Sequence, residues 1–170
     1  FSRDYPDAAG ENIAAHYAEL GTGNALFNRA ICLPGDTPFD DRFNRSGGEY
    51  IWVIKPFAEA GTPLVWVPEG LVEELVPTAR MTGSYLAARR FAQGQLRCQF
   101  YARRAGGSDW GSLVKWMAVG AVQMALHGAA FVALRGLGKA GAARQKAQFF
   151  GGLGKVAWWY GAKTSFYAGS

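Results

Sequence analysis

The stretch WMAVGAVQMALHGAAFVAL, from Trp116 to Leu134, contains nineteen residues without a formal charge and lies between Lys115 and Arg135. As a helix that rises about 1.5 Å per residue, it would just reach across a hydrocarbon core about 30 Å thick. The stretch is rich in Ala and Gly and contains Gln123 and His127, so it is only weakly apolar. It predicts a helix that contacts a membrane.

Basic residues flank this stretch at both ends. They are Arg103, Arg104 and Lys115 on one side, and Arg135, Lys139, Arg144 and Lys146 on the other. A single crossing of the bilayer would place one of the two basic clusters on the unfavourable side. A helix that lies in the interface, or a re-entrant hairpin, keeps both clusters against anionic headgroups. We therefore expect residues 111–170 to form amphipathic or re-entrant membrane-associated helices.

The charge of the chain is divided unequally between its halves. Residues 1–80 contain 6 basic and 12 acidic residues, a net charge of −6, whereas residues 81–170 contain 12 basic residues and only Asp109, a net charge of +11. The basic residues of the second half alternate with long apolar stretches, unlike the open polar surface typical of nucleic-acid binding. We expect an anionic membrane surface as a partner, and no nucleic acid.

Composition sets the broad class of the protein. The chain has 170 residues, of which 49% are hydrophobic, so it can bury a core and is not a disordered segment. Its two cysteines, Cys32 and Cys98, are too few for a disulfide framework or a cysteine-based zinc site, which indicates a reducing compartment. The chain begins at Phe1 without a signal segment, and we expect it to be a fragment.

Local patterns predict both strands and helices. A short mixed run after a glycine-rich turn suits a buried strand over Ala25–Ile31. The content of β-branched and aromatic residues favours a strand over Leu64–Pro68, and a second short strand is expected over Leu71–Val76, ended by Pro77. A helix is expected over Glu49–Ala60, with a kink or an early end near Ile54 because Pro56 lacks a backbone donor.

A longer helix is expected from Gly83 to Arg104, with Thr82 as its N-cap. Its arginines at positions 90, 97 and 104 recur every seven residues and so share one face. We expect residues 81–110 to form a basic linking helix. Within residues 111–170, Gln123 and His127 lie one turn apart and are expected to make a polar helix contact.

Six segments of the N-terminal half stand in a characteristic order. They are TGNALFNR (22–29), FDDRF (39–43), SGGE (46–49), AG (60–61), VWVPE (65–69) and VPTAR (76–80). Together they resemble the acceptor-side half of family 2 glycosyltransferases of the GT-A fold, of the bacterial exopolysaccharide type, over roughly residues 21–95. The resemblance implies an α/β fold, with residues 1–80 as a partial GT-A domain that lacks the donor-binding strands and the metal-binding Asp-x-Asp motif.

The resemblance also implies a catalytic position. The family's Gly-Gly-Glu-Asp motif supplies an Asp that takes the proton from the acceptor hydroxyl, and this chain reads Gly47, Gly48, Glu49, Tyr50. Tyr50 stands where the base is expected, and a phenol with an ordinary pKa of about 10 is a poor base at neutral pH. Three explanations remain open: Glu49 takes over, activity is lost, or the tyrosine reflects a one-base change from an Asp codon. A fourth interpretation gives Glu49 only the role of a helix-start carboxylate.

Residues 87–91, AARRF, stand where processive members of the family carry Gln-x-x-Arg-Trp, and only Arg90 matches. This favours the addition of one sugar per event. The resemblance assigns acceptor or diphosphate binding to Gly47, Gly48, Arg80, Arg89 and Arg90. Arginines further along the same helix are interpreted as a solvated or headgroup-facing stripe.

The function implied is therefore inverting transfer of a sugar from a nucleotide diphosphate donor to a saccharide or lipid-linked acceptor, at the cytoplasmic face of the bacterial inner membrane. No cofactor is expected on this fragment, whereas Mg²⁺ or Mn²⁺ is expected in a full-length enzyme. The adjacent pair Asp40 and Asp41 does not match the metal-binding spacing, so no metal residue is assigned. The alternatives are a non-catalytic membrane-binding module and an inactive pseudo-transferase.

Overall fold

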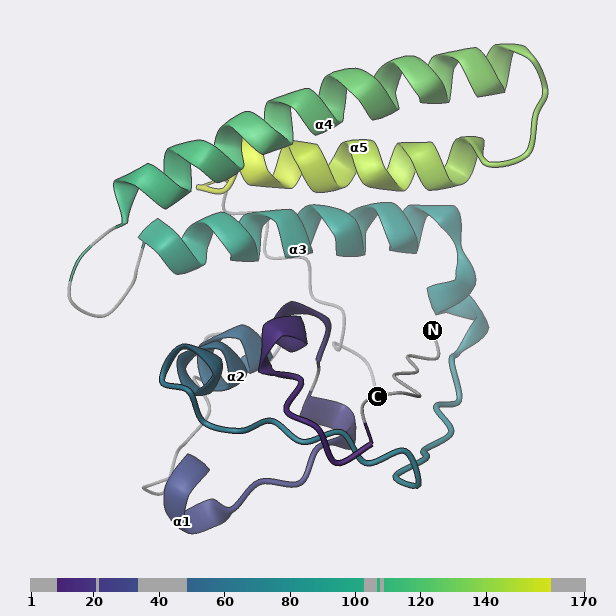
Figure 1. Ribbon diagram of the computed structural model, residues 1–170. Coiled ribbons are helices and arrows are strands. Elements are labelled where there is room, and N and C mark those ends of the chain that lie inside the picture. Colours follow the sequence, from purple (N-terminus) through teal and green to yellow (C-terminus); the bar gives the residue numbers. More distant parts are fainter. Residues whose placement is uncertain (1–8, 21, 34–48, 103–106, 108, 160–170) are drawn as a thin grey trace. The chain divides into compact units, whose positions relative to one another are not determined.

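The computed structural model describes residues 9–20, 22–33, 49–102, 107 and 109–159. The chain forms two compact units, Phe1–Leu75 and Val76–Ser170 (Figure 1). Helices make up 67% of the described part. The expectation of an α/β, GT-A-like fold is wrong, because within the described ranges strand pairing is limited to two isolated bridges, Ala9 with Trp66 and Asn12 with Val65.

The three predicted strands illustrate this correction. Within the first, residues Arg29–Cys32 form the short helix α1 instead. In the second only Val65 and Trp66 pair, and residues 71–76 have no regular structure. A β-branched run becomes a strand only when a neighbouring strand accepts its backbone hydrogen bonds. In the described part of this unit, the segment around Trp66 pairs through its backbone with the few residues from Gly10 to Ile13, which form no named strand.

The first unit has short helices around a small core. The 3₁₀ helices η2 and η3 cover Ala14–Glu19 and Thr22–Asn24, and α2 covers Glu49–Glu59. The helix predicted from Glu49 is confirmed, but its predicted early end near Ile54 is wrong, since α2 continues through Pro56. The helix ends at Glu59, and Gly61 follows it with a φ of 75°, which allows Thr62 N to donate to Phe57 O at 2.9 Å.

Three long helices dominate the second unit, after the 3₁₀ helix η5 over Thr78–Met81. Helix α3 covers Gly83–Ala102, α4 covers Trp110–Gly136 and α5 covers Ala142–Val156. Thr82 is confirmed as the cap of α3, because its Oγ1 accepts from Tyr85 N at 3.2 Å. Asp109 caps α4 in the same way through Ser112 N at 3.0 Å.

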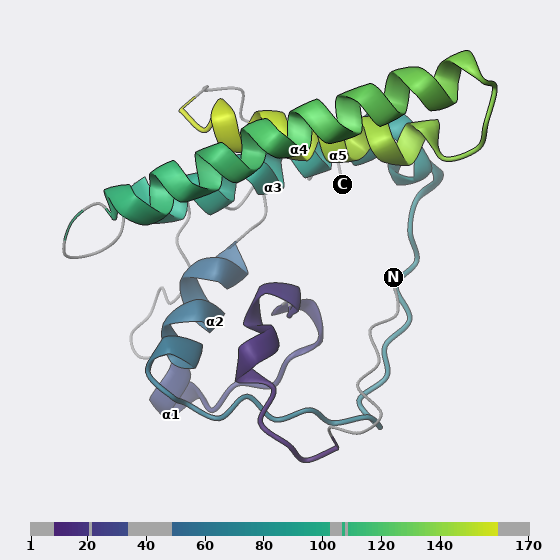
Figure 2. The same ribbon diagram turned by 45° about the horizontal axis from the view of Figure 1, so that its top comes forward.

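Helix α5 packs against both α3 and α4, and α3 also touches α4, so the last helix of the chain contacts both of the others (Figure 1). It runs antiparallel to α4, and the turned view in Figure 2 shows the same pairing. A tight turn after α4 allows α5 to run back along it. Gly138, at φ 63°, follows α4 and lets Lys139 N donate to Leu134 O at 2.9 Å.

Glycines allow α5 to touch the backbone of both neighbours. A Cβ on Gly154 would lie 2.0 Å from Phe91 O of α3, and one on Gly94 of α3 would lie 2.3 Å from Gly151 O of α5. On the other side, a Cβ on Gly120 of α4 would lie 2.8 Å from Gly152 O. Small residues at helix crossings that let backbones approach are typical of helices packed in membranes.

Two glutamines of α3 donate hydrogen bonds to backbone carbonyl groups just after the C-terminal end of α5. Gln95 Nε2 donates to Ala157 O at 3.2 Å, and Gln99 Nε2 donates to Trp158 O at 2.9 Å. Backbone carbonyls at the C-terminal end of a helix have no partner within the helix, so these bonds replace what water would otherwise supply. They also fix how far α5 can slide along α3.

We predict that Gly154→Ala destabilises the second unit by about 1 to 3 kcal/mol, because the added methyl group forces the two backbones apart. The matched control is Gly136→Ala, at the end of α4, where an added Cβ meets nothing within 4 Å. The control should be neutral or stabilising by up to about 1 kcal/mol, since Ala favours a helix over Gly. Thermal unfolding of both variants in detergent micelles, followed by circular dichroism, makes the comparison. Equal melting temperatures would contradict the described packing.

Candidate functional site

The predicted catalytic segment lies mostly outside the described residues. Gly47 and Gly48 fall there, as do Asp40 and Asp41. Glu49 and Tyr50 form the first positions of α2, where only their backbone is described. Their assignment to the base motif therefore stays a prediction.

The predicted anion-binding arginines belong to the second unit. Arg80 is half-buried in η5, whereas Arg89 and Arg90 are exposed on α3. Arg89 Nη1 donates to Tyr85 Oη, one turn earlier, at 3.3 Å. Arg90 lies against α5, where a Cβ on Gly151 would be 3.8 Å from Arg90 Cβ. Of the three, Arg90 is therefore the one that sits next to α5.

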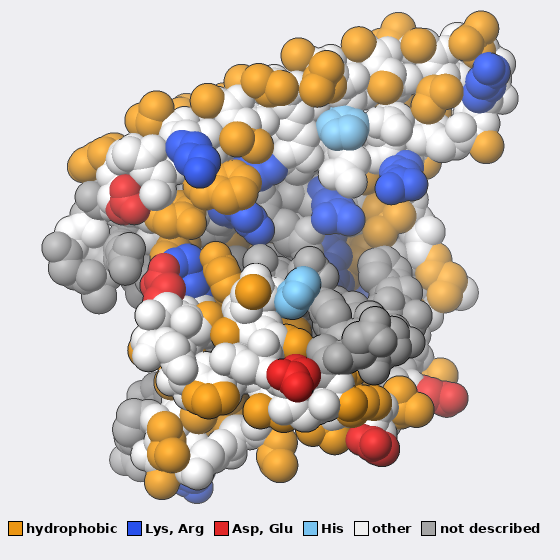
Figure 3. All heavy atoms as spheres, in the orientation of Figure 1, with side chains coloured by type: hydrophobic (Ala, Val, Ile, Leu, Met, Phe, Trp, Pro, Cys, Tyr) orange, Lys and Arg blue, Asp and Glu red, His pale blue; other side chains and the backbone are white. Residues whose placement is uncertain are grey.

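Helix α4 has two faces of opposite character. Its exposed face is apolar and carries no charge between Lys115 and Arg135, a length of nearly 30 Å at about 1.5 Å per residue. Figure 3 shows hydrophobic side chains gathered along this edge of the molecule. The exposed residues of that face are Ala118, Val119, Ala121, Val122, Ala125, Leu126, Ala129, Val132 and Ala133. Among the described residues, α4 is the one helix long and apolar enough to cross a membrane.

The opposite face of α4 carries its polar side chains, and these bond to α5. Gln123 Nε2 donates to Gln148 O at 3.1 Å, and its Oε1 accepts from Lys155 Nζ. His127 Nδ1 lies 2.6 Å from Gln145 Oε1. The polar contact expected between Gln123 and His127 is thus replaced by separate bonds from each residue to α5. We call this row of side chains the polar seam.

The polar seam explains the orientation of α4. Polar groups that are buried without partners cost free energy, and α5 supplies those partners from its own glutamines and lysine. The side of α4 turned away from α5 then has only apolar residues to present. Water-soluble helices have the reverse arrangement, with polar residues outward and apolar residues inward.

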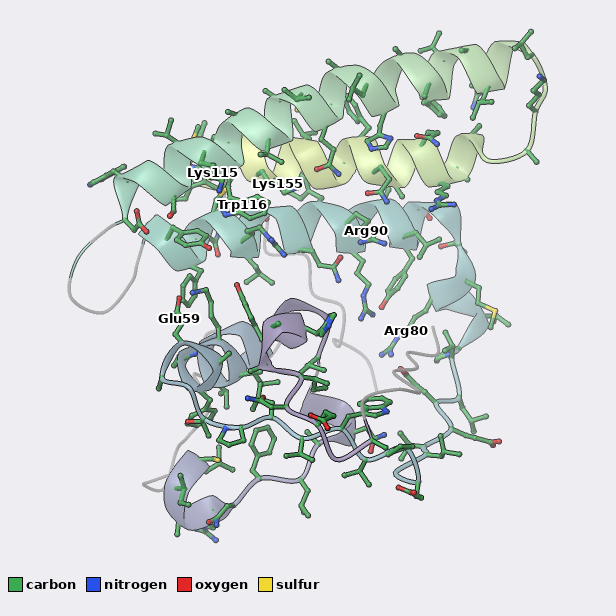
Figure 4. All side chains as sticks on the ribbon, in the orientation of Figure 1. Glu59, Arg80, Arg90, Lys115, Trp116 and Lys155 are labelled. Carbon is green, nitrogen blue, oxygen red and sulfur yellow. The ribbon has the colours of Figure 1, made fainter. Side chains whose placement is uncertain are left out.

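Two cations lie beside one aromatic ring, close to where α4 begins and α5 ends (Figure 4). The guanidinium carbon of Arg97, on α3, lies 4.4 Å from the ring centroid of Trp116, on α4. Lys155 Nζ, on α5, lies 6.0 Å from the same centroid. Arg90 lies two turns before Arg97 on α3, near Gly151 of α5. We call Arg90, Arg97 and Lys155, with Trp116, the cationic cluster.

The cluster is electrostatically strained. Burial lowers the pKa of Lys155, and the positive charge of Arg97 lowers this pKa further. Cys98 raises the pKa of Lys155 in part, and Arg90 lowers it by a smaller amount. The chain has only one acidic residue after Glu74, which is Asp109. The side chain of Asp109 accepts from the backbone at the start of α4. The charges of the cluster repel one another, and the acidic side chains of the second unit are too few to compensate them.

The cysteines offer no reactive group near the cluster. Cys98 is fully buried on α3, and burial raises the pKa of its thiol to about 11 against smaller opposing effects of Lys155 and Arg97. The thiolate is the nucleophilic form, so Cys98 is inert at neutral pH. Cys32 is half-buried in the first unit. Across the described ranges no three of the side chains that bind metals come together.

Sequence reasoning found the apolar stretch and the basic stripe but missed the cluster. From the sequence, Arg97 is expected in a solvated or headgroup-facing stripe and Lys155 beside the aromatic residues of an interfacial belt, and nothing in the sequence brings these two residues together with Trp116. The signal that could have found them is the sequence GGLGK, residues 151–155, because three glycines in four residues indicate a helix that touches its neighbours closely. A lysine directly after them lies at that same contact.

Comparisons of the chain with protein-family models, with curated proteins and with solved structures find no match.

Proposed function

We propose that the second unit attaches the protein to a membrane, with α4 lying in the plane of the interface. The observation that carries this proposal is the inverted character of α4, whose polar side chains bond to α5 while its apolar side chains face outward. In water, an exposed apolar face of this length would promote aggregation. Against a bilayer the same face contributes favourable burial.

The positions of the basic residues favour α4 lying in the plane of the membrane interface, as opposed to crossing the membrane or forming a re-entrant hairpin. The turn between α4 and α5 is flanked by Arg135, Lys139 and Arg144, and Lys115 lies at the other end of α4. Because α4 is one continuous helix, a re-entrant hairpin would have to turn between α4 and α5 and not within the apolar stretch. It would then carry the cations of that turn into hydrocarbon, at a cost of about 2.5 to 3.5 kcal/mol for each cation at the centre. An in-plane helix keeps both ends at the anionic headgroups. The side of the membrane that we propose is the cytoplasmic face of the bacterial inner membrane.

We predict that cysteines at both ends of α4 are labelled from the same side of sealed vesicles by a membrane-impermeant reagent. Gly111→Cys and Ala140→Cys place them at exposed positions before and after the apolar stretch. Cys32→Ser removes the background, and buried Cys98 stays silent and provides an internal control.

The two other arrangements give different results. Labelling of the two positions from opposite sides would show a crossing, and protection of position 140 from both sides would show a re-entrant hairpin. Failure of the chain to float with vesicles would remove membrane attachment itself, and a self-associated chain would then be the better explanation of the apolar face.

We propose as a second function that residues 22–80 take part in glycosyl transfer. What supports it is the order of the six segments between residues 22 and 80, which resembles that of family 2 glycosyltransferases. The proposal rests on those segments alone and assumes no GT-A sheet. Glu49 and Tyr50 stand at the base position, and the donor would be a nucleotide diphosphate sugar used with Mg²⁺ or Mn²⁺ by a full-length enzyme. The acceptor would be a saccharide or a lipid-linked sugar.

We predict that Tyr50→Asp raises sugar transfer by about 10²-fold or more in a protein that joins this sequence to a donor-binding domain, because a carboxylate can accept the proton of the acceptor hydroxyl. Glu49→Gln is the companion variant and should lower any activity that remains. Transfer of a radiolabelled sugar to membrane extracts measures both effects. No gain with Tyr50→Asp together with unchanged activity in Glu49→Gln would exclude this site from catalysis.

A further inference from the structure

We propose that Arg97, Lys155 and Trp116 form a phosphate-binding site at the membrane surface, with Arg90 at its edge. The inference rests on the proposed membrane attachment and names the group that the protein would recognise there. Its ligand class is a phosphate group, carried either by an anionic lipid or by a soluble phosphate or diphosphate.

The first argument is the convergence of charge from separate helices. Arg97 comes from α3 and Lys155 from α5, and both lie beside the ring of Trp116 from α4, at 4.4 Å and 6.0 Å. Two cations that share one ring repel each other, and the ring itself compensates only part of that repulsion. An anion between them would be attracted by both charges at once.

The second argument is the scarcity of acidic residues. Asp109 is the only carboxylate of the second unit, and its side chain already caps α4. Within the part of the chain that the structure describes, Lys155 Nζ donates to Gln123 Oε1, a neutral acceptor that leaves its charge unbalanced. A lysine ammonium has two further donors, and the planar guanidinium of Arg97 can form paired bonds to phosphate oxygens.

The third argument is position. Trp116 lies seven residues before Gln123, so both residues lie on the side of α4 that carries the polar seam. The opposite side of α4 is apolar. With a helix diameter of about 10 Å, the cluster lies within one helix width of the apolar surface. If that surface is in lipid, the cluster is at the depth of the headgroups, where Trp is enriched and lipid phosphates lie.

The test compares vesicles that match in surface potential but differ in the anion. One set owes its charge to phosphatidylglycerol and the other to a fatty acid carboxylate. The whole 170-residue chain should bind the phosphate vesicles more tightly by about tenfold or more, since several charge-assisted hydrogen bonds to phosphate are involved. Flotation at several lipid concentrations gives both partition coefficients.

The variant with both Arg97→Gln and Lys155→Gln should lose this preference. The matched control carries Arg144→Gln and Lys146→Gln, which removes the same charge from exposed positions of α5. The control should bind both vesicle types more weakly but keep the preference. Circular dichroism checks that each variant remains helical, and if the double variant does not fold, the two single variants make the same comparison.

Inorganic diphosphate distinguishes the two sources of the phosphate group. If the site takes a soluble anion, diphosphate abolishes the preference of the wild-type chain for phosphate vesicles. If it takes only a lipid headgroup, the preference survives the addition. Either result keeps phosphate as the ligand.

Two outcomes would overturn the proposal. One is equal binding of the wild-type chain to both vesicle types, which would show that its charges act diffusely. The other is a preference that survives the double variant at Arg97 and Lys155. Neither result would affect membrane attachment, which fails only if the chain binds no vesicles at all.

Discussion

The backbone contact between α5 and its two neighbours determines most of what the second unit can do. Gly154 and Gly94 bring α5 against α3, while Gly152 and Gly120 bring it against α4, at distances that leave no room for a Cβ atom. Once α5 occupies that side of α4, Gln123 bonds to its backbone and His127 to the side chain of Gln145. The apolar face of α4 is then left outside, which is what makes a membrane the natural surface to cover it.

The same contact concentrates positive charge. Because α3 and α5 run side by side in the same direction (Figure 1), Arg97 and Lys155 reach the same ring, that of Trp116. The sequence places 12 basic residues and one acidic residue after Arg80, so compensation has to come from outside the second unit. The proposed apolar burial and the proposed anion binding would therefore act at neighbouring places, and each would strengthen the other by holding the helices at the surface.

Part of this arrangement can be predicted from the sequence. Thr82 caps α3 as the local rule for capping predicts, whereas Pro56 does not end α2 as the local rule for proline predicts. The long uncharged stretch correctly predicts α4 as the membrane-length helix. The α/β fold could not be obtained correctly from segments such as Leu64–Pro68, because strand formation depends on distant partners that local composition does not reveal. The cationic cluster was missed for the same reason, since its members lie on three helices.

The most direct test of the account measures how deep each exposed residue of α4 lies in a bilayer. Spin labels at Val119, Val122, Leu126 and Val132 can be compared by their accessibility to oxygen, which concentrates in lipid, and to a water-soluble nickel complex. An in-plane helix predicts four lipid-exposed labels at one common shallow depth, with a label at Gln123 much less accessible to either reagent. A depth that rises to a maximum in the middle of α4 would contradict the in-plane account, and four water-exposed labels would contradict membrane attachment altogether.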